Sequence, residues 1–318
     1  MTEIGYTLSS EEHGPNDLVE HAGRAEEAGF DFLSISDHYH PWVSAQGHSP
    51  FVWGTLGGVA HATEEVDVGV GVSAPIMRMH PAIYAQAAAT AAAMFEDREF
   101  FFGVGTGENL NEHVLGDHWP EHAVRMEMLE EAVEVIRKLW TGEQVSHRGP
   151  HYTVENARLF TLPEEPPKIC VSAVGERAAR TAAEFGDGFW AVGPQETVQT
   201  WEEEGGEGPR FCQLSACVAE TEEAAVETVH ERWPNTALPG ELSQILPTTA
   251  HFEQATSMVT EEDIAEGSTI TGPDVQPHID SIQGAIDAGY DHVYVHQVGD
   301  DQEALFDLYE EEVLPSFS

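Results

Sequence analysis

The chain has 318 residues, of which 57 are acidic and 13 are basic, so its formal net charge is −44. This length is enough for one α/β barrel with insertions or for two ordinary domains. The phosphates of nucleic acids would meet net repulsion, so we expect no nucleic-acid partner. The acids are spread along the whole chain and only Lys138 and Lys168 are lysines, which favours a salt-adapted cytoplasmic protein over an acidic mesophilic one.

The cysteines and the apolar runs argue against several further classes of protein. Cys170, Cys212 and Cys217 are odd in number and lack CxxC spacing, so we expect small buried hydrophobes rather than a disulfide framework or a zinc knuckle. The first four residues are too polar to begin an export signal. The alanine-rich run Pro81 to Phe95 is interrupted by polar residues, so it predicts a helix packed on a sheet and no membrane span.

Strand-like runs alternate with helical segments along the chain. The predicted strands are Ile4–Leu8, Phe32–Ile35, Val66–Val72, Phe100–Val104, Lys168–Ser172, Gly188–Val192, Phe211–Ala219 and His292–His296. The predicted helices between them include Pro15–Ala28, Pro81–Phe95, Pro120–Trp140, Glu176–Phe185 and Glu222–Trp233, several with proline in the first turn. Eight such alternations are typical of a (β/α)8 TIM barrel, an α/β fold, and no linker divides residues 1–318 into separate domains.

Two stretches interrupt the alternation. Residues 147–163 contain Gly149-Pro150 and alternating apolar positions, which predicts a surface hairpin. Residues 234–271 are rich in Pro, Thr and Glu with short helical pieces. Long insertions in a barrel commonly form lids or oligomer contacts, and the sequence leaves both roles open for the second stretch.

The run Asp37-His38-Tyr39-His40-Pro41-Trp42 follows the second predicted strand directly. In parallel α/β proteins, chemistry gathers at the carboxyl ends of the strands. A histidine titrates near neutrality, so it can take the proton of an alcohol while the carbon loses a hydride, and a tryptophan offers a flat wall. The structural alternative is that Asp37 and His38 cap the strand end while Trp42 packs.

Glycine-rich segments follow three other strands. Gly103-Val104-Gly105-Thr106-Gly107-Glu108 has G-x-G-x-G spacing after a fourth strand, which disfavours a Rossmann site but exposes Glu108 as a candidate acid. Gly71-Val72-Ser73-Ala74-Pro75 offers small residues to a flat ligand. Ala173-Val174-Gly175-Glu176 precedes a helix whose free amides would bind a phosphate, with Arg177 or Arg180 as counter-charge. A structural turn explains each segment equally well taken singly.

Together these motifs resemble a known family. The runs Ile35 to His38, Pro41-Trp42, Gly103 to Glu108 and Leu110-Asn111-Glu112 are similar to those of the coenzyme F420-dependent glucose-6-phosphate dehydrogenases and secondary-alcohol dehydrogenases, which are luciferase-like barrels. The likeness is close from Gly5 to about Val192, looser near His292 to Pro315, and poor from Pro194 to Gly272. It implies coenzyme F420, a small-molecule CH–OH donor and a homodimer, and the charge points to a haloarchaeal-type member.

The resemblance assigns roles residue by residue. It implies that His38 is the base, that Trp42 stabilises the substrate, and that Glu108 supports or protonates the deazaflavin ring. Glu11 would line the substrate pocket. The implied coenzyme contacts are Asp37, Gly71, Val72, Thr106, Gly107, Asn111, Ala173, Val174, Gly175 and Glu176, with a non-proline cis peptide at Gly71-Val72 and the coenzyme phosphate on the loop Val174 to Glu176. No metal is implied.

The match fails where sugar-phosphate members of the family hold the substrate phosphate with lysines and an arginine. The corresponding positions here are Gln195, His251 and the neighbourhood of Gly267-Ser268. Glutamine and serine replace a cationic clamp only in part. A small secondary alcohol, an unphosphorylated sugar and a differently held sugar phosphate all stay open as substrates.

Three other functions compete with this interpretation. A monooxygenase or reductase of the same superfamily would use FMN or F420, since a fold does not determine its chemistry. A protein that binds the deazaflavin without catalysis is the non-enzyme alternative. A metal-dependent barrel hydrolase would use His38-Tyr39-His40 and His296, but the middle strands lack its usual Lys or His ligands.

Folding should require salt. Self-repulsion among 57 acids is screened within about 3 Å at 1 M salt but only within about 10 Å at 0.1 M, so we expect the melting temperature to rise from dilute buffer to molar KCl. Thermal unfolding followed by circular dichroism measures this. An unchanged melting temperature would contradict salt adaptation.

Overall fold

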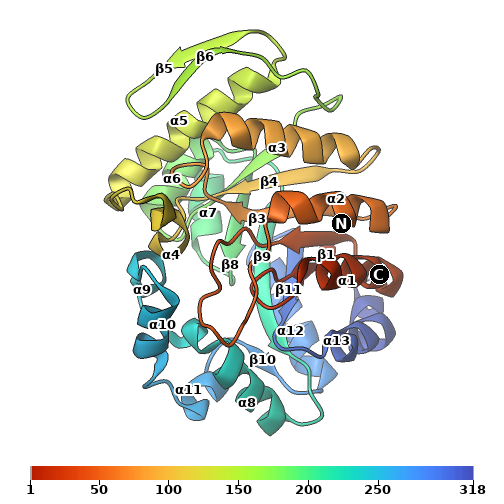
Figure 1. Cartoon of the computed structure of the whole chain (residues 1–318). Coiled ribbons are helices and arrows are strands. Elements are labelled where there is room, and N and C mark those ends of the chain that lie inside the picture. The colour runs from red at the N-terminus through yellow and green to blue at the C-terminus, as the bar shows by residue number, and fades with distance from the viewer. Residues whose placement is uncertain (1, 318) are drawn as a thin grey trace.

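The computed structural model describes residues 2–317, in which eight parallel strands close into a barrel surrounded by helices (Figure 1). In barrel order the strands are β1 (Glu3–Leu8), β2 (Phe32–Ile35), β3 (Asp67–Ser73), β4 (Phe100–Val104), β7 (Lys168–Ser172), β8 (Gly188–Val192), β9 (Arg210–Cys217) and β11 (His292–Gln297), which pairs with β1 again. The predicted (β/α)8 fold is confirmed. Strand ends differ from the prediction by one or two residues, chiefly in β3 and β9.

The outer layer contains more helices than the prediction. The helices outside the second predicted insertion include α1 (Pro15–Ala28), α2 (Val52–Ala62), α3 (Pro81–Met94), α5 (His122–Trp140), α6 (Glu176–Phe185), α7 (Thr197–Glu203), α8 (Glu222–Arg232), α12 (Val275–Asp287) and α13 (Gln302–Leu308). Helix α2 is absent from the prediction because its three glycines lower helix propensity. Its Gly58 faces α1 so closely that a Cβ would lie 2.6 Å from Val19 Cγ2. No helix within residues 2–317 is both long and apolar enough to cross a membrane.

Aromatic rings fill the inside of the barrel. Trp190 stacks on Phe211 with ring centroids 4.1 Å apart, and its indole N–H donates to the Tyr294 hydroxyl. Gly71 on β3 touches the same indole, since a Cβ there would lie 2.4 Å from Trp190 Cζ2. The three cysteines are buried thiols, as expected. The barrel interior is therefore packed, which leaves its rim for binding.

Both predicted interruptions lie outside the strand and helix alternation. The first is an antiparallel hairpin of β5 (Val145–Arg148) and β6 (Thr153–Ala157), which begins two residues and ends six residues earlier than predicted and lies beyond α5 in Figure 1. The second holds the short elements α9 (Leu242–Ile245), α10 (Thr249–Thr256), α11 (Glu261–Ala265) and β10 (Ile270–Thr271). Figure 1 places α9 and α10 below α4 (Asn109–Glu112), the short helix that follows β4.

Candidate functional site

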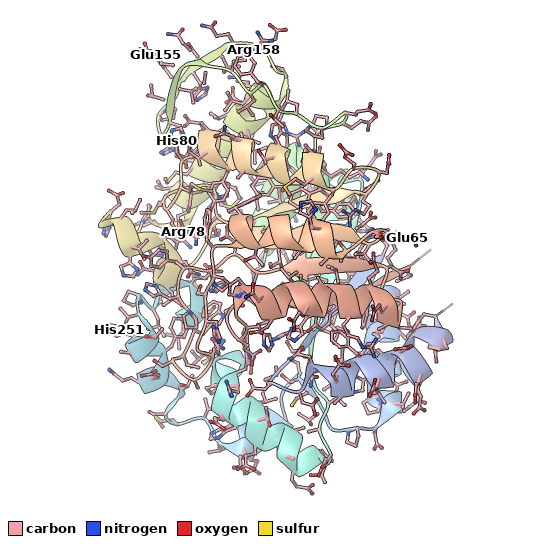
Figure 2. All side chains as sticks on the ribbon, turned by 45° about the vertical axis from the view of Figure 1, so that its right-hand side comes forward. Glu65, Arg78, His80, Glu155, Arg158 and His251 are labelled. Carbon is pink, nitrogen blue, oxygen red and sulfur yellow. The ribbon has the colours of Figure 1, made fainter. Side chains whose placement is uncertain are left out.

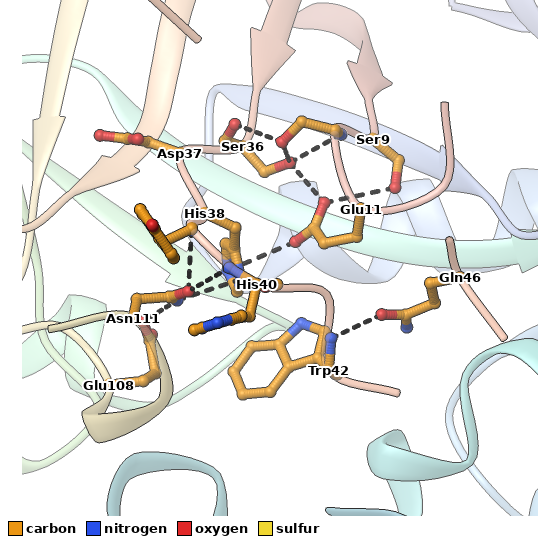
Figure 3. Close-up of polar contacts among 12 residues, drawn as sticks. Ser9, Glu11, Ser36, Asp37, His38, His40, Trp42, Gln46, Glu108 and Asn111 are labelled. Carbon is orange, nitrogen blue, oxygen red and sulfur yellow. Dashed lines mark hydrogen bonds and ion pairs between the residues drawn. The ribbon is translucent and has the colours of Figure 1, made fainter. Parts of the chain in front are cut away.

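His38 lies beyond the end of β2 and is held on both ring nitrogens (Figure 3). Its Nε2 is 3.3 Å from Glu11 Oε1, and its Nδ1 is 3.1 Å from the Asn111 side-chain amide and 3.2 Å from the His40 carbonyl oxygen. Glu11 comes from the loop after β1 and is 3 % exposed. The Ser36 hydroxyl donates to its other oxygen at 2.6 Å. Segments after β1, β2 and β4 thus meet at one imidazole.

Asn111 determines which nitrogen of neutral His38 carries the proton. Its Oδ1 accepts the backbone N–H groups of Tyr39 and His40 at 2.9 and 3.1 Å. The amide nitrogen must therefore face His38 Nδ1 and Glu108, whose Oε2 it reaches at 3.3 Å. Neutral His38 then accepts at Nδ1 and carries its proton on Nε2, toward Glu11. Protonated His38 would donate from Nδ1 to the His40 carbonyl, so both charge states have partners.

Trp42 forms an aromatic wall beside this imidazole. Its ring centroid is 4.9 Å from that of His38 and 5.1 Å from that of Phe252 on α10. The Trp42 backbone N–H donates to Gln46 Oε1 at 2.7 Å, which closes the loop after the Pro41 bend. An indole between a base and a phenyl ring leaves an apolar surface next to the histidine.

A buried ion cluster supports the site from behind. Arg78, in the loop after β3, is 2.9 Å from Asp37 Oδ1 and 3.4 Å from Glu112 Oε1, and its backbone N–H donates to Glu112 Oε2 at 2.8 Å. Ser73 and Tyr84 donate to the remaining Asp37 oxygen at 2.5 and 3.4 Å. Because both Asp37 oxygens have protein partners, contact of this carboxylate with a coenzyme stays a prediction.

The cluster has an excess of negative charge. Burial lowers the pKa of Arg78, but Asp37, Tyr84 and Glu112 outweigh it and raise that pKa, so the guanidinium stays charged. Burial raises the pKa of Glu112 to about 7, although Arg78 acts in the opposite direction. One guanidinium therefore faces two carboxyls, and Glu112 with a pKa of about 7 is only partly ionised at neutral pH.

The glycine loop after β4 fits tightly on this cluster. Gly107 has a φ of 66°, and a Cβ there would lie 2.7 Å from Ala74 Cβ and 2.9 Å from Glu112 Cγ. Only glycine adopts this conformation without strain at so close an approach. The Gly71-Val72 peptide is cis, as expected, and Thr106 and Glu108 are half-buried at the rim.

The loop after β7 is open to solvent. Val174, Gly175 and Glu176 are exposed and Ala173 is buried. Gly175 is the N-cap of α6, and a Cβ there would meet no atom within 4 Å. The backbone amides at the start of α6 are thus accessible to a phosphate. Arg180 is paired with Glu204 and Glu176.

Gln195 and His251 lie apart from the His38 contacts. The Gln195 amide donates to the Val192 carbonyl at 3.0 Å. His251 is exposed at the edge of the molecule (Figure 2), and its Nδ1 is 2.7 Å from Thr248 Oγ1. Within residues 2–317, no hydrogen bond or ring contact joins either of them to His38 or Trp42. The next residue on α10, Phe252, makes the contact with Trp42.

Sequence reasoning missed Arg78, Phe252 and the role of Glu112. Arg78 had a usable signal, because it is the only cation between Arg24 and Arg98 and follows a strand end. Phe252 had none, since its helix lies in the stretch where the motifs predicted only a poor likeness to the family. Among residues 2–317, no three His, Cys, Asp or Glu side chains are arranged to hold a metal ion. A cavity of about 650 Å³ lies at the opposite barrel end, beside Asp67 and Glu99 at the starts of β3 and β4.

Comparisons with known proteins agree with this geometry. The family described as luciferase-like monooxygenase matches residues 1–298. An F420-dependent glucose-6-phosphate dehydrogenase of Kribbella flavida is 36 % identical over 98 % of this chain and 97 % of its own, and one of Intrasporangium calvum is 32 % identical over 99 % and 98 %. The structure of an F420-dependent secondary alcohol dehydrogenase with an F420-acetone adduct superposes with a TM-score of 0.91 at 28 % identity, covering 100 % of this chain and 99 % of that one.

Removing the buried cation should destabilise the fold. Arg78→Met leaves two buried carboxyls without their counter-ion, and we expect the free energy of unfolding to fall by about 3 to 5 kcal/mol. Arg148→Met is the control: its pair with Glu155 is 74 % and 68 % exposed, so we expect a change within about 1 kcal/mol. Urea unfolding in molar KCl measures both. Equal losses in the two variants would contradict this role of Arg78.

Glu112 should make stability depend on pH. Because its pKa rises from 4.5 to about 7 on folding, the folded protein holds a proton between these values that the unfolded chain releases. Wild-type stability should therefore decrease, relative to Glu112→Gln, as pH rises from 5 to 8. Urea unfolding of both proteins at each pH gives this difference. A difference that is constant or increases with pH would refute the raised pKa.

Proposed function

The chain belongs to the luciferase-like monooxygenase family, and from that membership we propose that it is a coenzyme F420-dependent dehydrogenase acting on a CH–OH carbon. The observation that carries the proposal is the position of His38, between a buried carboxylate and an amide that leaves its Nδ1 as an acceptor. Curated relatives of full-length coverage are named as F420-dependent dehydrogenases, which supports the same activity.

The rim fits a flat anionic coenzyme. Gly107 brings bare backbone to the rim beside Thr106, and the start of α6 presents free amides at Gly175. We propose that the ring lies against the first segment and Gly71-Val72, and that the phosphate lies on residues 173–176. Asp37 and Asn111 complete the proposed contacts. Once bound, the deazaflavin accepts a hydride, and the remaining chemistry is that of the protein side chains.

The protein's task in this reaction is to take the hydroxyl proton and orient the alcohol. The Glu11–His38 pair takes the proton, since Glu11 and the His40 carbonyl accept from both nitrogens of a protonated imidazole. Trp42 orients the carbon against its ring face. Glu108, held by Asn111, faces the proposed coenzyme edge. These are our assignments of the catalytic roles.

The substrate we propose is an uncharged alcohol. Trp42 and Phe252 form an apolar wall, and Arg232, the cation nearest in sequence to the second insertion, is engaged by the Ala45 carbonyl and Asp300. Gln195 and His251, where sugar-phosphate enzymes of the family have cations, point to other partners. The likeness to a secondary alcohol dehydrogenase of known structure supports this class. Deazaflavin reduction with a panel of secondary alcohols, sugars and sugar phosphates in molar salt tests it.

We also propose that residues 1–318 form one domain with insertions near 147–163 and 234–271, and that the protein is a salt-adapted homodimer of the cytoplasm. The net charge of −44 supports salt adaptation. The dimer comes from the resemblance alone, and the cytoplasmic location comes from the acidic composition. Light scattering in molar KCl measures the number of subunits.

Loss of the His38 imidazole should separate catalysis from binding. His38→Ala removes the proton acceptor but none of the proposed coenzyme contacts, so we expect turnover to fall by about 100-fold or more. Coenzyme affinity, measured by fluorescence titration, should stay within about threefold. His40→Ala is the matched control, because its Nδ1 faces the Leu110 carbonyl, and it should retain turnover. Full turnover by His38→Ala would rule out His38 as the base.

A further inference from the structure

A second buried acid–base pair, Glu12 and His296, lies next to the candidate base. Glu12 Oε2 is 3.0 Å from His296 Nε2, and Glu12 Oε1 accepts the Gly299 N–H at 3.0 Å. The two side chains are 0 % and 2 % exposed. The Trp233 ring, with its centroid 4.6 Å from that of His296, packs on the pair. None of the roles assigned above uses these two residues.

One hydroxyl connects this pair with the candidate site. Ser9 Oγ lies 3.4 Å from Glu11 Oε2 and 3.5 Å from Glu12 Oε2. A serine hydroxyl has a single proton and two lone pairs, so it can donate to one carboxylate and, once the other carboxyl is protonated, accept from that one. Figure 3 shows the contacts from Ser9 through Glu11 to His38. The polar chain is continuous from His38 to His296.

Three titratable side chains around the second pair stay neutral at pH 7. Those near Glu12 are Tyr6 on β1, His13 in the loop after β1 and Cys217 on β9. Burial raises the pKa of Tyr6 far above its ordinary value and that of Cys217 to about 12, and it lowers the pKa of His13 to about 4. His21 and Asp300 act on His13 from farther out, and Asp300 is paired with Arg232. Glu11, His38, Glu12 and His296 are therefore the groups left to exchange a proton.

We propose that Ser9 passes the proton released by alcohol oxidation from the Glu11–His38 pair to the Glu12–His296 pair. This rests on the proposed dehydrogenase function. The substrate O–H bond breaks as the hydride leaves its carbon, and the proton enters the Glu11–His38 pair. The proton on Glu11 then bonds to Ser9 Oγ while the Ser9 proton bonds to Glu12 Oε2, next to His296. The Glu12–His296 pair then releases the proton to solvent before the next turnover, and Glu11 returns to its ionised form.

This relay makes the second turnover depend on Ser9 more than the first. A site that has just taken a proton cannot take another until the Glu11–His38 pair is reset. Blocking the relay should leave the first hydride transfer fast and slow all later ones. A structural role of Ser9 would instead lower both rates together.

The test compares first-turnover and steady-state rates of deazaflavin reduction in Ser9→Ala and Ser9→Thr. For Ser9→Ala we expect a burst of one equivalent per site at a rate within about twofold of wild type, followed by a kcat about tenfold lower. Ser9→Thr keeps the hydroxyl and should restore kcat. Glu12→Gln keeps an oxygen for Gly299 but takes up no proton, and should give the same burst if Ser9→Ala fails to fold.

Ser36→Ala is the matched control. It removes a shorter bond, 2.6 Å, from the same Glu11 oxygen but does not touch Glu12, so it should lower both rates by one factor. Proton inventories of kcat in mixed H2O and D2O should be curved for wild type and linear for Ser9→Ala. The relay would be overturned if neither Ser9→Ala nor Glu12→Gln showed a burst. In that case the variants would either keep the wild-type kcat or lose the first-turnover rate and the steady-state rate by the same factor. A wild-type protein that fails to reduce deazaflavin with every alcohol tested would instead overturn the proposed function.

Discussion

The arrangement of the rim depends on one buried guanidinium. Arg78 holds Asp37, which precedes His38, and Glu112, which follows Asn111. The segments after β2 and β4 would otherwise repel each other, because each brings a carboxylate into the same dry space. The glycine at position 107 lets the segment after β4 pack closely on Ala74, in the loop after β3, and on its own Glu112. The hydrogen bonds from Asn111 to the His38 loop follow from this closeness, and they orient the imidazole.

Two layers of polar contacts behind the site differ in their function. The layer around Arg78 is ionic and has one arrangement of hydrogen bonds. Asp37 also accepts from the Ser73 and Tyr84 hydroxyls, and Glu112 accepts from the Arg78 backbone N–H. The layer around Ser9 has one hydroxyl proton shared by two carboxylates, so it admits two arrangements of nearly equal geometry. A fixed support on one side and an exchangeable one on the other suit a base that must keep its position while its charge changes.

The sequence predicts the barrel well because buried strands are continuous apolar runs and because each strand end carries a short motif. That topology brings Glu11 and Asn111 to the His38 imidazole and places Glu108 beside Asn111. Helix α2 escapes prediction because its glycines serve packing against Val19 and have poor helix propensity. The sequence predicts His251 at the substrate. In the structure His251 faces outward, and the next residue, Phe252, packs against Trp42. Which of two adjacent helical residues faces the site depends on the rotation of α10 about its axis, which the sequence does not predict.

The contact between Phe252 and Trp42 joins the loop after β2 to helix α10 of segment 234–271. In the function that we propose, the strand ends form the floor under the substrate and α10 forms its roof. The proposed proton-handling groups lie on the loops after β1, β2 and β4 and on β11, and none of them belongs to α10. Under this proposal, segment 234–271 is the place to graft a different substrate specificity while these groups keep their positions.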